Sequence, residues 1–135
     1  MNPHLKTKAV AKAFYANYLK RSEECLQTAK DAFLKKSWNA AAICCIHSSI
    51  AACDAMCIYY LGQRHSGEDH NQAVQLFKKT KNEDDLILRN SKRLSQLLTI
   101  KNMAEYEERL VFQTEAEKIL KNCERFLAYV RKQIP

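Results

Sequence analysis

The stretch from Leu97 to Arg109, LLTIKNMAEYEER, contains the residue types that best suggest chemistry on a phosphate-bearing molecule. Lys101 supplies a positive charge, Asn102 follows it, and Tyr106 places a phenol five positions after the lysine. A lysine attracts phosphate as a point charge, without the two-pronged grip of an arginine. A tyrosine is a poor general base at neutral pH, because its ordinary pKa is about 10. The stretch therefore indicates binding more strongly than catalysis.

Two ionisable residues stand inside an apolar segment, AAAICCIHSSIAACDAMCIYYLG. His47 and Asp54 are seven residues apart, so on a helix they share a face at a separation of about 10 Å. An unpaired charge is expensive to bury. In a cleft the two would transfer a proton or orient a substrate; otherwise they bond to another helix or across a dimer interface. Ser48 and Ser49 are predicted to bond to the preceding helical turn.

The same segment raises the question of a metal site. Cys53 and Cys57 are one helical turn apart and could share an ion, with Cys44 and His47 nearby in the sequence. However, Cys44 and Cys57 point about 140° apart on one helix. Structural zinc sites usually take their ligands from short loop spacings such as C-x-x-C. We therefore expect no metal and no cofactor.

Helices must position these residues, because the composition is that of an all-α protein. The 135 residues include only 2 Gly and 2 Pro, and tight turns between strands need such residues. We predict one domain over residues 1–135, an up-and-down bundle of four major helices and one short helix. The predicted helices cover residues 5–36, with a break near KRSEE, then 40–61, 68–79, 84–104 and a last helix opened by a capping box of Thr114 and Glu117.

The helix over residues 40–61 is predicted to be apolar on nearly every side and to end at Gly62. Such a helix belongs at the centre of a bundle or across a subunit interface. Four of the 6 Cys lie in it and behave as small core residues. The start of the chain lacks a signal-peptide pattern, so we expect reduced thiols and a cytoplasmic location. No apolar run approaches the roughly 20 residues that span a bilayer, so no membrane contact is expected.

The net charge of +7 is unevenly distributed along the chain. Residues 1–36 and 78–101 are strongly basic, whereas residues 102–117 carry five acidic side chains against one arginine. Arg89, Lys92 and Arg93 share a helical face at three-and-four spacing, which suits contacts with phosphates. Basic helical faces are usually just solvated, so the asymmetry permits contact with a polyanion without requiring it.

Three segments together resemble the HEPN superfamily of prokaryotic helical domains. That family's first two core helices are similar to CLQTAKDAFLKKSWNAAAICCIHSSIAACDAMCIYYLG. The connector and short helix that follow in one branch resemble RHSGEDHNQAVQLF, and the closing helix pair resembles RLSQLLTIKNMAEYEERLVFQTEAEKILKNCERFLAYV. The likeness extends from about residue 20 to the end of the chain.

The resemblance implies a site and a mode of action. In nuclease members of the family an Arg, a polar residue and a His line a cleft between two protomers, and these positions correspond here to Lys101, Asn102 and Tyr106. Because two of the three differ, the resemblance implies a non-catalytic or weakly active homodimer, joined through its central and motif helices. Its partner would be RNA or a nucleotide, held by Lys101, Asn102 and the cations at 89, 92 and 93, or a nucleotidyltransferase-type protein.

The competing hypothesis is a metal-independent ribonuclease, acting as the toxin of a toxin–antitoxin pair. His47, or His65 or His70 in the connector, would replace the missing motif histidine, and Asp54 would orient it. A helical bundle that binds a small ligand is a third interpretation. The motif lysine and tyrosine diverge by about 140° on an unbroken helix, so we expect them to converge only if the helix ends between them.

Overall fold

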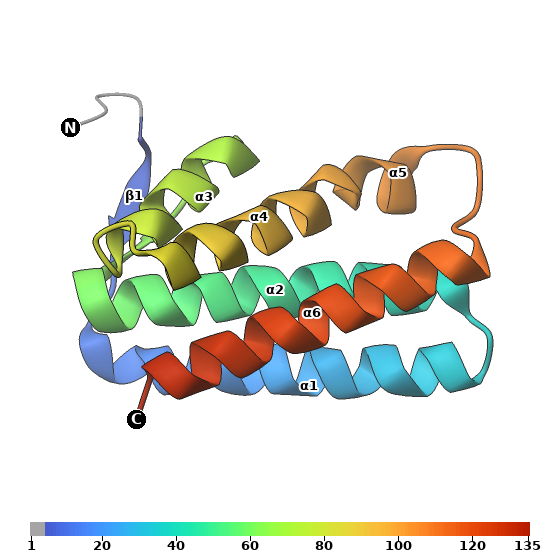
Figure 1. The fold of residues 1–135 in the computed structure, drawn as a ribbon, viewed down its shortest axis with the longest axis horizontal. Coiled ribbons are helices and arrows are strands. Elements are labelled where there is room, and N and C mark those ends of the chain that lie inside the picture. The colour runs from blue at the N-terminus through green and yellow to red at the C-terminus, as the bar shows by residue number, and fades with distance from the viewer. Residues whose placement is uncertain (1–4) are drawn as a thin grey trace.

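The computed structural model describes residues 5–135, and helices make up most of that length (Figure 1). The elements in chain order are β1 (Thr7–Ala9), the 3₁₀ turn η1 (Lys12–Phe14), α1 (Tyr15–Leu34), α2 (Trp38–Leu61), β2 (Gln63–His65), α3 (His70–Lys79), α4 (Asp85–Thr99), α5 (Lys101–Tyr106) and α6 (Gln113–Gln133). The long helices α1, α2, α4 and α6 lie alongside one another (Figure 1). The predicted all-α fold is confirmed.

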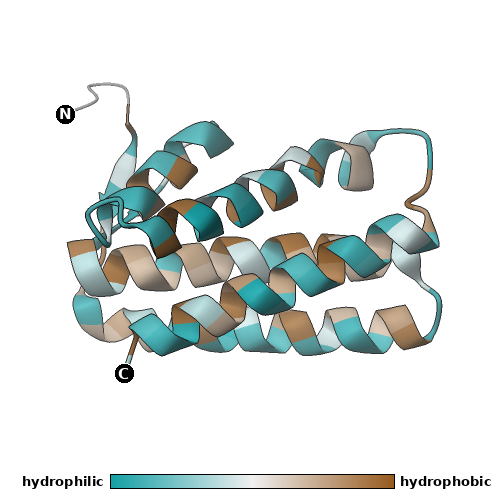
Figure 2. Ribbon diagram, viewed as in Figure 1, coloured by the Kyte–Doolittle hydropathy of each residue, from teal (hydrophilic) through white to brown (hydrophobic). Residues whose placement is uncertain are grey.

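Helix α2 is the centre of the bundle. Buried residues cover most of its circumference, among them Ala42, Ala51, Ala55 and Cys57, and α1 and α6 make its most extensive contacts. Figure 2 shows that much of the neighbouring helices' outer surface is hydrophilic. By length and composition alone α2 could cross a membrane, contrary to our expectation, but 72% of its most apolar window is buried inside the protein. Burial in the protein core therefore explains the apolar surface of α2.

Two serines let α1 approach α2 closely. Ser22 Oγ donates to the Ser48 carbonyl at 2.7 Å, and Ser48 Oγ donates to the Ser22 carbonyl at the same distance. Both side chains are fully buried, so this exchange satisfies hydroxyl groups that would otherwise be costly there. Ser49 bonds to the Cys45 carbonyl at 2.9 Å, as predicted, whereas the prediction for Ser48 is wrong because Ser22 faces it.

The first ten described residues are not helical, contrary to the prediction for residues 5–36. β1 pairs antiparallel with β2, placing Thr7 opposite His65 and Ala9 opposite Gln63. Gly62 ends α2 with a φ of 68°, as expected, and leaves an extended segment whose backbone groups need partners. This long-range pairing overrides the local helix propensity of the N-terminal residues. From Tyr15 onward α1 continues unbroken through KRSEE, where we expected a break.

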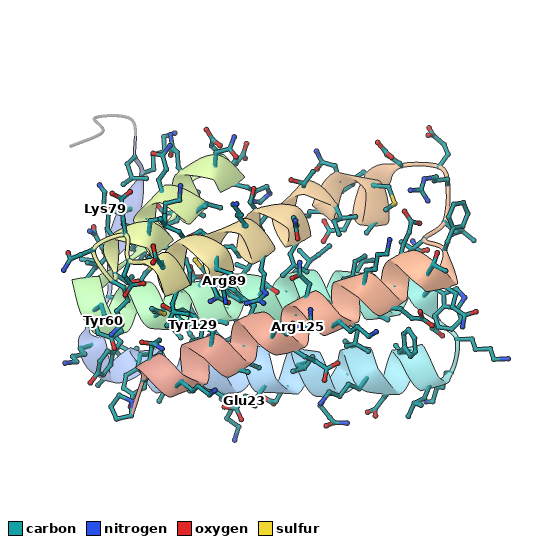
Figure 3. All side chains as sticks on the ribbon, viewed as in Figure 1. Glu23, Tyr60, Lys79, Arg89, Arg125 and Tyr129 are labelled. Carbon is teal, nitrogen blue, oxygen red and sulfur yellow. The ribbon has the colours of Figure 1, made fainter. Side chains whose placement is uncertain are left out.

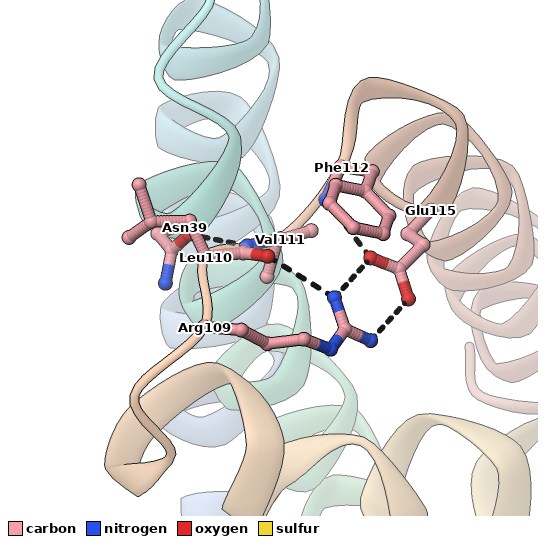
Figure 4. Close-up of polar contacts among 6 residues, drawn as sticks. All are labelled: Asn39, Arg109, Leu110, Val111, Phe112 and Glu115. Carbon is pink, nitrogen blue, oxygen red and sulfur yellow. Dashed lines mark hydrogen bonds and ion pairs between the residues drawn. The ribbon is translucent and has the colours of Figure 1, made fainter.

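The C-terminal half also differs from the prediction in two places. The helix expected over residues 84–104 is divided at Ile100 into α4 and α5. The predicted capping box of Thr114 and Glu117 does not open the last helix, because α6 already begins at Gln113. Instead the Glu115 carboxylate accepts a hydrogen bond from the Phe112 backbone N–H at 2.9 Å (Figure 4).

The connection between α5 and α6 is held by side chains at both ends (Figure 4). Arg109 forms a two-pronged pair with Glu115 at 2.9 and 2.7 Å. At the other end, Asn39 at the start of α2 accepts a hydrogen bond from the Val111 N–H at 2.7 Å and donates to the Ala104 carbonyl at 3.2 Å. One amide therefore fixes both the end of the motif helix and the approach to α6.

We expect Asn39→Ala to lower the free energy of unfolding by about 1–3 kcal/mol, because it leaves the buried Val111 N–H without a partner. Urea denaturation measures the change. Asn102→Ala, on the exposed side of α5, is the control and should shift stability by less than about 0.5 kcal/mol. Equal losses in the two variants would show that the Asn39 bonds do not support the connection.

Candidate functional site

A pocket of about 240 Å³ lies where α2, β2, α3, α4 and α5 meet. Its ionisable lining residues come from four of these elements: Asp54, Arg64, His65, His70 and Lys101. Apolar side chains of α2, α3 and α4 form the rest of the wall, namely Ile50, Cys53, Ala73, Leu94 and Leu98. The structure therefore brings together one predicted carboxylate, the motif lysine and two of the three histidines considered as replacements.

Backbone pairing, a helix cap and a helix break place these side chains. The ladder with β1 holds β2, and the Ser66 N–H donates to the Lys6 carbonyl at 3.0 Å. Asp69 caps α3 by accepting from the Asn71 N–H at 2.9 Å, so His70 is the first residue of that helix. The division at Ile100 makes Lys101 the first residue of α5. Every ionisable group except Asp54 thus stands at the start of a helix or in a short strand.

The motif lysine has an acidic partner that our sequence analysis missed. Lys101 Nζ lies 3.6 Å from Glu105 Oε2, and His47 Nε2 lies 3.6 Å from Glu105 Oε1. The i,i+4 spacing of Lys101 and Glu105 is a helix-pairing signal that was visible in the sequence. This pairing offsets the positive charge that a phosphate would otherwise meet at the motif.

The structure separates several residues that the sequence suggested as one site. His47 does not line the pocket, and its side chain is 54% exposed beside Glu105. Asn102 is exposed and borders a neighbouring groove with His70. Tyr106 is 73% exposed. His47 and Asp54 therefore do not work as one pair.

We expected Lys101 and Tyr106 to approach each other only if the helix ended between them, and this prediction is wrong. Helix α5 continues through both residues, yet Lys101 Nζ lies 5.9 Å from the centre of the Tyr106 ring. The flexible four-carbon stem of the lysine bridges the angle that the helix imposes. The contact is weak at this distance, and the exposed phenol has no place in the pocket.

Burial dominates the electrostatics of the pocket. It raises the pKa of Asp54 to about 7, although the guanidinium groups of Arg64 and Arg21 act in the opposite direction. Burial lowers the pKa of His65 and of His70, and the Lys101 ammonium lowers that of His70 further. At neutral pH both imidazoles are therefore uncharged, and Asp54 is divided between its two protonation states.

The basic residues of α4 do not share one surface. Arg89 and Lys92 are exposed, whereas Arg93 is partly buried and donates to Asn90 Oδ1 at 2.9 Å. Arg93 lies in the field of Arg89 and of Arg125 from α6; burial, followed by these two charges, lowers its pKa. Lys92 instead borders a groove between α3 and α4. The single face expected for residues 89, 92 and 93 is therefore divided into two.

All six cysteines are free thiols. Within residues 5–135, no cluster of three or more His, Cys, Asp or Glu side chains is arranged to hold a metal ion. Cys45 and Cys123 meet in the core between α2 and α6, where the Cys123 thiol donates to the Cys45 carbonyl at 3.4 Å. These cysteines pack as small core residues, which is the role their sequence context predicts.

Comparison with known families assigns the fold. A family model described as the HEPN domain matches residues 15–133, which is most of the chain. A search of curated proteins found no match. The chain belongs to the HEPN family, and the resemblance noted from residue 20 onward is confirmed.

We expect Asp54→Asn to change the free energy of unfolding in a pH-dependent way. The variant's free energy of unfolding minus that of the wild type should be higher at pH 8 than at pH 4 by roughly 2–4 kcal/mol. The folded pKa of Asp54 is about 7, above its ordinary value of 3.8, so the folded state keeps a proton that the unfolded chain has lost. That contribution is complete below about pH 4 and disappears as the pH rises through 7. The asparagine never ionises and avoids the loss.

Urea denaturation of the wild type and the variant at pH 4, 6 and 8 measures the difference, and titrations shared by both proteins cancel. Glu68→Gln, which alters an exposed carboxylate in the loop between β2 and α3, is the control and should show little pH-dependent difference. A stability difference for Asp54→Asn that stays constant across the pH range would contradict the buried state of this carboxylate.

Proposed function

We propose that this HEPN domain is a cytoplasmic, non-catalytic binding module that contacts RNA through basic residues of α4 and α6. The observation that carries the proposal is the gathering of Arg89, Arg93 and Arg125 where the two helices pack together. Figure 3 labels Arg89 on α4 and Arg125 on α6, and the charges of both contribute to lowering the pKa of Arg93. Like charges repel in the absence of a partner, and a phosphate backbone would relieve that repulsion.

The surroundings of the arginines support the same proposal. None of the ion pairs within residues 5–135 includes Arg89, Arg93 or Arg125, so no carboxylate of the described chain competes with a phosphate for them. Asn122 of α6 donates to the Arg93 carbonyl at 3.3 Å, which ties the two helices at this point. The planar guanidinium is also the side chain best suited to gripping phosphate oxygens in pairs. We expect backbone recognition with little preference for sequence.

The weakness of the motif supports a binding role over catalysis. The lysine at the motif's arginine position is paired with Glu105, and the tyrosine at its histidine position is exposed to solvent. General acid–base catalysis requires a group that titrates near the operating pH within reach of the substrate. The motif residues themselves offer no such group.

We further propose that the domain acts as a homodimer through the connection that follows the motif helix. Tyr106, Leu110 and Phe112 are 73%, 71% and 60% exposed, an unusual density of large apolar side chains on a surface. Much of the central helix, where we expected part of the interface, is covered by the chain's own helices, so we place the interface on this connection instead. An interface at residues 106–112 would lie next to the motif, where the family resemblance places it.

RNA binding is tested with a labelled unstructured 20-nucleotide RNA in the presence of a chelator. We expect Arg89→Ala, Arg93→Ala and Arg125→Ala together to weaken retention at least tenfold in 0.1 M salt and to reduce the salt slope by about 2. The matched control combines Lys20→Ala, Lys35→Ala and Lys79→Ala, which removes the same charge from exposed positions outside α4 and α6. Equal weakening by the control set would mean that the arginine cluster is not the contact surface.

Homodimer formation is tested by light scattering on the purified chain. We expect a dimer at micromolar concentration, which Leu110→Ser with Phe112→Ser converts into a folded monomer. Leu86→Ser with Leu88→Ser alters two exposed leucines on α4 and should leave the dimer intact. A monomeric wild type would refute the homodimer and would favour a nucleotidyltransferase-type protein as the partner of this segment.

A ribonuclease is the second candidate, and one observation favours it. His70, Lys101 and Asp54 line one pocket, and the lowered pKa of His70 keeps an uncharged imidazole available as a base. In the same RNA assay, cleavage that is abolished by His70→Ala and Lys101→Ala, but not by His47→Ala, would establish this activity. Retention without cleavage would support the binding module.

A further inference from the structure

We propose that the pocket between α2, β2, α3, α4 and α5 binds a small anionic molecule, one phosphate or carboxylate group joined to a short apolar portion. This site is separate from the arginine surface proposed for RNA, because none of Arg89, Arg93 and Arg125 lines the pocket. The inference therefore does not rest on RNA binding, and either one can fail without the other.

Two polar atoms at the pocket lack the partners that folded proteins normally provide. Arg64 Nε and His65 Nε2 are both buried, and neither has a hydrogen-bond partner of good geometry in the described chain, although the Gln72 side chain lies close enough to His65 to act on its pKa. Almost all buried polar atoms in native proteins are paired, so two neighbouring exceptions in one cavity wall need an explanation. A small rotation of these side chains would let Arg64 Nε donate a hydrogen bond to a ligand oxygen. His65 Nε2 would donate to the ligand when it carries a proton, or accept from a ligand hydroxyl when it does not.

The loop between β2 and α3 passes close over one of these atoms. Gly67 lines the pocket, and a Cβ atom added to it would lie 3.2 Å from His65 Nε2 and 3.4 Å from Lys6. The glycine hydrogen therefore allows the backbone to pass directly over the imidazole. Ser66, next to it in the lining, adds a hydroxyl that is free to donate or accept. The loop combines close backbone approach with polar groups, as small-ligand sites commonly do.

The charge of the lining selects an anion over a cation. Asp54 is the only carboxylate among the lining residues, and burial keeps its pKa near 7, so its negative charge is incomplete at neutral pH. Arg64 contributes a guanidinium to the lining, and Lys101 contributes an ammonium whose charge is only partly offset by Glu105, which lies outside the lining and also pairs with His47. The field inside the pocket is therefore positive at and below neutral pH.

The size and the apolar wall limit the ligand further. A volume of about 240 Å³ is below the range of about 300–1,000 Å³ typical of sites for larger organic ligands. Ile50, Leu94 and Leu98 would contact a carbon skeleton, which a bare inorganic ion does not possess. A single ring or a short chain carrying one anionic group fits both features.

Binding is tested by thermal shift and calorimetry at constant ionic strength, with benzoate, phenyl phosphate and inorganic phosphate as probes. Benzylamine and benzyl alcohol have nearly the same ring but a positive or no charge. We expect saturable stabilisation by benzoate, phenyl phosphate or both, weaker binding of inorganic phosphate, and no effect of the other two. The ratio of the two organic anions identifies which anionic group the pocket prefers. Benzylamine binding as strongly as the anions, or no saturable anion binding, would overturn the proposal.

Variants locate the probe. Arg64→Met and Lys101→Met should each weaken anion binding at least tenfold, whereas Arg131→Met and Lys35→Met, at exposed positions outside the pocket, should not. If a pocket variant does not fold, the wild type still gives an answer by NMR. Anion titration should shift the ring resonances of His65 and His70 and leave that of His47 unchanged. Equal shifts of all three, or loss of binding in the outside variants, would place the ligand elsewhere.

Discussion

The helix α2 has no polar face, and the rest of the structure follows from the need to enclose it. Long helices can cover most of a cylinder, and α1 and α6 do so along nearly its whole length. On the remaining side the cover is made of α4 and of the short elements β2, α3 and α5. Short pieces meet at their ends, and ends carry polar backbone and polar side chains. The pocket, with Asp54 on its α2 wall, lies in this part of the cover.

The HEPN resemblance would place the positive side chains that are available to an anion at the motif, but they lie mainly outside it. The lysine at the motif shares Glu105 with His47, so local acid and base satisfy each other. The connector after α2 supplies the nitrogen-bearing side chains that face the cavity, and the helix pair α4–α6 supplies the unpaired guanidinium groups. The proposed recognition of anions is thereby divided between two surfaces, while the end of the motif helix and the connection after it expose large apolar side chains.

Periodicity and composition predicted the helices, the position of the apolar rod and its end at Gly62, because these depend on local sequence. The pairing of β1 with β2 was not predictable, since it joins residues almost sixty positions apart without turn residues between them. The division at Ile100 has no Gly or Pro to mark it. Arg64 and Arg125 were missed because only tertiary contacts give them neighbours, whereas Glu105 was within reach of a simple spacing rule.

The short strand β1 has a practical consequence for anyone choosing where this domain begins. The family match starts at residue 15, so a version of the chain trimmed to that boundary would lack the strand that backs β2. Its long helices would remain, and a spectroscopic check of helix content would pass. However, β2, which carries Arg64 and His65, would have lost its pairing strand. A loss of the proposed anion binding would then be attributed to the wrong residues. The folded unit therefore begins upstream of the region that the family model matches.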